Sequence, residues 1–253
     1  MSIIENIMLS LGMIGAIYYN LQKEMFLNRI LSFEIVIIMV FSLLCISLHR
    51  YIQSYFAYKA GDINQKVEGF LTLNPFKFVD IIGLIPFIFF KFGWAKPINS
   101  SRVLKSESTF QRLGIILSGI IMNLLLGFVL ALLIKPTENV SLTLAAIINL
   151  FSRINIYYGL FSLLPIPPLD GWLILMALLK RNINVTQVEL YGELIIIILI
   201  GSNILPKIIS YLGNFLFIYW CSECNVINKA IQIFNHKLIS WTLWKNEDFS
   251  SKY

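Results

Sequence analysis

Long apolar stretches, separated by short polar or proline-containing segments, are the main pattern along this chain. Three are long enough to cross the ~30 Å hydrocarbon core of a bilayer, which takes about 20 apolar residues in a helix. They run from Ile35 to Tyr58, from Leu113 to Ile134 and from Ser141 to Leu164. Two further spans are predicted, from Val188 to Leu205 and from Ile208 to Cys221. The pattern predicts an all-α polytopic membrane protein.

Composition and charge agree with a membrane protein. Of the 253 residues, 57% are hydrophobic and only 13% are charged, whereas soluble domains have about 25% charged residues. The net charge of +6 would suit nucleic acid, but the basic side chains form no binding motif, so we expect no nucleic-acid partner. Five of them, against one glutamate, lie in the loop from Lys91 to Arg112. The positive-inside rule places this loop in the cytoplasm.

The chain reads as one membrane domain, residues 31–221, with an extension at each end. Residues 1–30 are predicted to be an N-terminal extension, in which Ile7–Tyr19 forms an extra or surface-lying helix. Glu5 and the lack of a small-residue cleavage site argue against a secretory signal peptide. Residues 222–253 are predicted to be a polar tail.

The apolar run Ile81–Phe90 is too short to span a membrane and is interrupted by Gly83 and Pro86. Such a run is typical of a re-entrant or hairpin segment. Backbone of this kind is tolerated at membrane depth only where protein or a water-filled cavity satisfies its polar groups. We therefore expect a cavity inside the domain.

Ionisable residues inside spans are costly, by roughly 2.5–3.5 kcal/mol each on insertion scales, and usually have a function. His49 lies in the first long span, near its cytoplasmic end, and shares one helix face with Cys45 and Gln53 because these positions recur every four residues. Asp170 follows a segment whose prolines prevent a regular helix and leave backbone carbonyls without partners. The two residues are the candidate polar site.

The segment Leu163–Gly171, which reads LLPIPPLDG, resembles the second signature of the site-2 protease family of intramembrane zinc metalloproteases. The likeness is greatest to the compact prokaryotic branch of that family, and it implies a helix bundle in a prokaryotic plasma membrane. It also implies that Asp170 corresponds to the third zinc ligand. Other segments resemble recurring family segments in order and spacing: Tyr58–Asp62, Leu71–Pro75, Phe92–Pro97, and Ser118, Gly119 and Asn123.

The first long helix departs from the family pattern. The family carries H-E-x-x-H there, in which two histidines bind zinc and the glutamate acts as general base. This chain has His49 at the first position, Arg50 at the glutamate position and Gln53 at the second histidine. Ser162 also replaces the asparagine that usually opens the second signature.

These changes remove both a ligand and the base. A catalytic zinc takes three protein ligands from His, Cys, Asp or Glu, and His49 and Asp170 supply two. The guanidinium of Arg50 stays protonated and has no lone pair, so it cannot accept a proton from water. Two interpretations of Arg50 remain open: it reaches the cytoplasmic headgroups, or it pairs with Asp170 and replaces the metal as counter-charge.

We therefore predict a catalytically degenerate homologue that binds no zinc, keeps the cavity and binds transmembrane segments of other proteins without cutting them. One alternative is an active intramembrane zinc metalloprotease with an atypical site, in which Cys45 is the third ligand. Another is a small channel or transporter, since buried ionisable groups also line ion pathways. The residues expected to line the cavity are Asn123, Ser162, Pro165 and Pro167.

Overall fold

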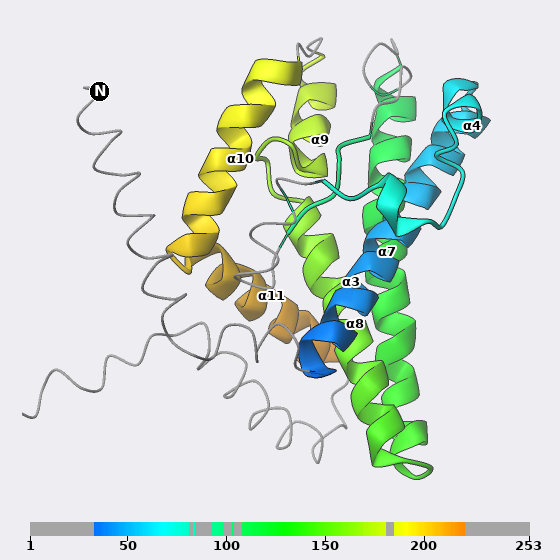
Figure 1. The fold of residues 1–253 in the computed structure, drawn as a ribbon, viewed down its shortest axis with the longest axis vertical. Helices are drawn as coiled ribbons and strands as arrows, with labels where there is room; N and C mark the ends of the chain where they lie inside the picture. The colour runs from blue at the N-terminus through cyan, green and yellow to red at the C-terminus, as the bar shows by residue number, and fades with distance from the viewer. Residues whose placement is uncertain are drawn as a thin grey trace, which may run out of the picture. The chain divides into compact units, whose positions relative to one another are not determined.

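Figure 1 shows the computed structural model of the chain, which describes residues 33–80, 83, 93–98, 103, 108–180 and 185–220. These residues form helices and loops, with one isolated antiparallel bridge between Val79 and Ala95. The protein is thus an all-α polytopic membrane protein, as predicted. The chain divides into two compact units, Met1–Val40 and Phe41–Tyr253, and every candidate site residue belongs to the second unit. The predicted extension at 1–30 and the tail at 222–253 lie outside the described residues.

Three long helices are apolar enough to cross a membrane. They are α3 (Phe33–Lys59), α7 (Thr109–Glu138) and α8 (Leu142–Ser162). In α3 the candidate span is Val36–Lys59, whereas α7 and α8 qualify over their whole lengths. Ser108 and Ser141 cap the starts of α7 and α8, where each hydroxyl accepts a backbone N–H three residues further on. These helices confirm the first three predicted spans.

The last two predicted spans need correction. The helices there are α10 (Val185–Gly201) and α11 (Ile204–Trp220), each of 17 residues. The chain breaks between them at Ser202 and Asn203, where Asn203 takes a left-handed conformation with φ of 61°. The helix axes differ by 76° across this break, and the two helices together make a fourth candidate span as one bent pair. The described chain thus has three or four candidate spans, and not five.

Helices α7 and α8 pack closely because small residues face one another. The Ser152 hydroxyl in α8 donates to the Gly127 carbonyl in α7 at 2.7 Å. A Cβ atom at residue 127 would lie 2.6 Å from Cγ1 of Ile156, so only glycine fits without displacement. Small residues at helix interfaces let backbones approach in this way. Glycine at residue 127 thus permits the close packing of α7 against α8.

The segment Leu163–Leu169 leaves the helical path after α8, and α9 (Asp170–Leu178) begins directly after it. Gly171 lies against the backbone carbonyl of Leu163, and Gly192 of α10 lies against that of Pro167; a Cβ atom at either position would overlap these carbonyls. The proline segment is therefore held between two helices. This packing fixes the position of Asp170 at the start of α9.

The region between α3 and α7 contains α4 (Asn64–Val67) and the 3-10 helix η1 (Pro75–Lys77). After η1 the chain pairs with a later segment, where Lys96 N–H donates to the Phe78 carbonyl at 3.0 Å. Of the predicted re-entrant segment Ile81–Phe90, the structure describes only Gly83. The chain segments before and after it are thus paired, at Phe78 and Lys96. The rest of the expected re-entrant segment lies outside the described residues.

Candidate functional site

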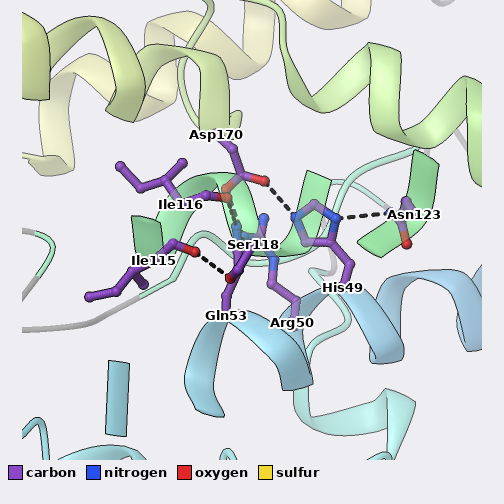
Figure 2. Close-up of polar contacts among 8 residues, drawn as sticks. All are labelled: His49, Arg50, Gln53, Ile115, Ile116, Ser118, Asn123 and Asp170. Carbon is purple, nitrogen blue, oxygen red and sulfur yellow. Dashed lines mark hydrogen bonds and ion pairs between the residues drawn. The ribbon is translucent and has the colours of Figure 1, made fainter. Parts of the chain in front are cut away.

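Five polar side chains from three helices meet in the interior of the second unit (Figure 2). His49, Arg50 and Gln53 come from α3, Asn123 comes from α7, and Asp170 comes from the first turn of α9. All five are buried, and the most accessible, Arg50, is only 4% exposed. The two ionisable positions expected from the sequence, His49 and Asp170, are thus brought together.

His49 bridges Asp170 and Asn123 through its two ring nitrogens. Its Nε2 lies 2.7 Å from Oδ2 of Asp170, and its Nδ1 lies 2.9 Å from Nδ2 of Asn123. The Asn123 amide nitrogen is a donor, so Nδ1 accepts and Nε2–H donates to the carboxylate. This arrangement fits a neutral imidazole and engages both nitrogens.

Arg50 occupies the other side of the carboxylate. Its Nη1 donates to Oδ1 of Asp170 at 2.8 Å and to Oε1 of Gln53 at 2.6 Å. Gln53 in turn donates through Nε2 to the Ile116 carbonyl of α7 at 2.9 Å. Of the two interpretations of Arg50, the geometry favours the ion pair over a side chain that reaches the headgroups. A charge-assisted network thus ties α3 to both α7 and α9.

Gly119 allows α7 to approach this network. A Cβ atom at residue 119 would lie 2.7 Å from Cδ2 and Nε2 of His49 and 2.8 Å from Cγ of Gln53. Such distances are below ordinary contact, so a side chain would displace the imidazole or the amide. Gly119, together with Ser118 and Asn123, resembles a recurring segment of the site-2 protease family, and the close approach to His49 gives a steric reason for a glycine at this position.

Tyr158 of α8 also belongs to the site, although the sequence analysis did not single it out. Its ring contacts the His49 ring edge to face, with centroids 5.3 Å apart and an interplanar angle of 89°. Tyr158 precedes Ser162 by four residues, so both lie on one face of α8. This four-residue spacing from Ser162 is the sequence signal that could have pointed to Tyr158.

The predicted cavity-lining residues differ in their placement. Asn123 contacts His49 directly, as expected. Ser162 and Pro167 are buried, but Pro165 is exposed. Among the bonds of the described residues, none joins Ser162 to the cluster of His49, Arg50 and Asp170. A lining role for Ser162, Pro165 and Pro167 stays a prediction.

The residues of the site do not fit a catalytic zinc. The described residues contain no group of three or more His, Cys, Asp or Glu side chains placed to hold a metal ion. Cys45 is buried one turn before His49 and completes no such group. Both Asp170 oxygens and the His49 Nε2 already have partners, one of which is a cation. A dication at this place would face the Arg50 guanidinium in a poorly screened setting.

Two buried polar atoms of the site have no hydrogen-bond partner among the described residues. Nε of Arg50 and Oδ1 of Asn123 are buried and have no hydrogen-bond partner in the described part of the chain. Nε of a guanidinium is only a donor and cannot bind zinc. Neither the guanidinium of Arg50 nor the amide of Gln53 can act as a general base at neutral pH. The cluster therefore has the character of a charge-paired helix junction.

The chain is similar to a bacterial protein of known sequence. A protein of Bacillus subtilis (strain 168) named "Putative zinc metalloprotease YwhC" is 31% identical over 173 residues, which cover 63% of this chain and 79% of that protein. No protein-family profile matches the chain. No solved structure matches it.

Proposed function

Since the chain belongs to the site-2-protease-like family of zinc metalloproteases, we propose that it is a member that does not cut peptide bonds and instead binds membrane segments of other proteins. The single observation that carries this proposal is the 2.8 Å contact between Nη1 of Arg50 and Oδ1 of Asp170. The residue that stands at the general-base position has become the counter-ion of the carboxylate that stands at the third ligand position.

A guanidinium cannot replace the chemistry of zinc. Metal-assisted hydrolysis needs a Lewis acid that binds water and lowers its pKa, together with a base that accepts the proton. Arg50 offers only hydrogen-bond donors, and His49 already donates to Asp170. We therefore assign the cluster a structural role, in which the Asp170 carboxylate is held between His49 and Arg50.

Binding of membrane segments follows from the scaffold that remains. The three spanning helices, the proline segment before α9 and the placement of Asp170 are all present. A bundle that keeps this arrangement retains the means to hold a transmembrane partner after its chemistry is lost. The resemblance to the compact prokaryotic branch supports a location in the plasma membrane, and the positive-inside count supports an orientation with the polar cluster toward the cytoplasm.

Metal analysis of the purified protein tests the first half of the proposal. We expect less than stoichiometric zinc, and we expect a chelator to leave the thermal unfolding temperature unchanged. The Asp170→Ala variant is the matched control for any metal detected. Stoichiometric zinc in the unaltered chain that disappears in this variant would overturn the proposal, as would chelator-sensitive cleavage of a single-span substrate.

A restoration tests how much of the ancestral site remains. The double change Arg50→Glu with Gln53→His rebuilds H-E-x-x-H on α3, and zinc and proteolysis are then measured together. If both appear, the loss of activity is confined to these two positions. If neither appears, the surroundings of the site have also changed. The single change Gln53→His is the control, because it restores a ligand and leaves Arg50 in place.

Binding is tested in the unaltered protein. The protein is crosslinked to single-span membrane proteins in vesicles and the products are examined for both adducts and cleavage. We expect adducts whose partners keep their full length. Cleaved partners would contradict the proposal, and the absence of any adduct would contradict its binding half.

A further inference from the structure

A second arginine, Arg153, lies in the middle of the spanning helix α8. It is the twelfth of the 21 residues of that helix, so it is about 16 Å from the start and about 14 Å from the end at 1.5 Å per residue. Its side chain is only 8% exposed. Charges at this depth are costly and are almost always paired with an opposite charge or face a polar cavity.

The immediate partners of Arg153 are all neutral. Its Nε donates to Oδ1 of Asn149 at 3.1 Å. Its Nη1 donates to the Tyr157 hydroxyl at 3.2 Å and to Oδ1 of Asn214 in α11 at 2.7 Å. Its Cζ lies 4.0 Å from the centre of the Phe217 ring, in the geometry of a cation–π contact. Within the described part of the chain, this set orients the guanidinium and supplies no opposite charge.

The nearby ion pairs do not supply the missing charge. In the part of the chain that the structure describes, both ion pairs use Asp170, with His49 and Arg50 as partners. The bonds of Arg153 use Nε and Nη1, which leaves Nη2 for a further acceptor. Among the described residues, the site therefore holds a cation and lacks one anionic group.

We propose that Arg153 receives a membrane-embedded carboxylate from a transmembrane segment of a partner protein, at the place where α11 meets α8. A carboxylate accepts hydrogen bonds from Arg in a fixed planar geometry, which gives both charge neutralisation and specificity. The proposal does not rest on the loss of proteolysis, because Arg153 takes no part in the cluster at Asp170.

The depth of Arg153 favours a partner side chain over a lipid phosphate. An arginine that reaches for headgroups extends along the helix toward one membrane surface. Arg153 is instead bonded to Asn149 one turn before it and to Tyr157 one turn after it. Its guanidinium is thus held near its own level, where a carboxylate on a spanning helix lies within reach and a headgroup does not.

The test uses synthetic transmembrane peptides and the full-length protein in phosphatidylcholine vesicles, with binding followed by fluorescence energy transfer. One leucine-rich peptide, about 20 residues long, carries a single central Asp, and its matched control carries Asn. We expect the Asp peptide to bind at least about tenfold more tightly. A third peptide, with its Asp near one end, should bind no better than the Asn peptide.

The peptide comparison uses the unaltered protein, so it does not depend on any variant folding. The preference for Asp should fall to about onefold in Arg153→Gln and persist in part in Arg153→Lys. Equal binding of the Asp and Asn peptides, absence of binding, or a preference that survives in Arg153→Gln would each overturn the proposal. If adding phosphatidylglycerol abolished the preference for the Asp peptide, and did so through Arg153, a lipid phosphate would be the ligand. That result would overturn the proposal as well.

Discussion

Arg50 and Arg153 both place a guanidinium inside a spanning helix, but their surroundings differ. Arg50 contacts the Asp170 carboxylate at 2.8 Å, whereas the contacts of Arg153 with the described residues are to amide and hydroxyl oxygens and an aromatic ring. The first charge is balanced within the chain, and its removal leaves a buried opposite charge behind. The second is held in place with no opposite charge among the described residues. The difference separates an arginine that joins helices through an ion pair from one that, as proposed above, binds a carboxylate of a partner protein.

The largest effect should come from Asp170→Asn, which removes the carboxylate with little change in shape. Arg50 then stays buried without a counter-charge, so we expect the free energy of unfolding to fall by about 3–5 kcal/mol. The measurement is denaturant unfolding of the detergent-solubilised protein. A loss below about 1 kcal/mol would contradict the central role of the ion pair.

Removing both charges of the Arg50–Asp170 pair should lower the free energy of unfolding less than removing one. In the double variant Arg50→Leu with Asp170→Leu no charge remains unpaired, so we expect a smaller loss than in Asp170→Asn, by about 2 kcal/mol or more. The same unfolding measurement applies, with each single variant as control. Additive losses in the double variant would show that the two side chains act separately.

Gly119 offers a test of the packing around the site, with a matched control on the same helix. A methyl group at residue 119 meets the His49 ring at 2.7 Å, whereas one at Gly114 meets nothing within 4 Å. Gly119→Ala should therefore destabilise the protein by about 1–3 kcal/mol. Gly114→Ala should be neutral or stabilise it by up to about 1 kcal/mol, because alanine favours a helix. Equal effects of the two changes would contradict the close approach of α7.

The smallest effect is expected at Arg153. In the protein without a partner, Arg153→Leu loses hydrogen bonds but also removes an unbalanced buried charge, so the free energy of unfolding should change by less than about 1 kcal/mol. The unfolding measurement above decides this. A loss as large as that of Asp170→Asn would mean that the charge is already balanced, and the contrast between the two arginines would disappear.

The spanning helices were predictable because their signal is local. The length of an apolar run decides whether a helix can cross a bilayer, and α3, α7 and α8 lie within a few residues of their predicted bounds. The break before α11 was misplaced because it depends on the left-handed backbone of Asn203. Counting apolar residues does not reveal this backbone conformation. The two helices flanking Asn203 were therefore predicted as separate crossings.

The site was predictable only in part. Resemblance to family signatures paired His49 with Asp170, and loss of the base followed from the chemistry of Arg50. The choice between a headgroup contact and an ion pair depended on where α9 lies relative to α3, which helix periodicity does not give. Tyr158 and the steric role of Gly119 likewise depend on contacts between helices. Arg153 carried a visible signal, a charge inside an apolar run, which the sequence analysis passed over.

The counter-ion of Asp170 is part of the polypeptide and cannot dissociate. A zinc-dependent relative must acquire its metal after synthesis, so its completion depends on how much metal the cell supplies. In this chain the cation beside Asp170 is a side chain and is present as soon as the polypeptide is made, with Nη1 of Arg50 at 2.8 Å from the carboxylate. It follows from the proposed function that assembly of this membrane protein does not depend on the zinc supply, so metal starvation should leave its abundance unchanged.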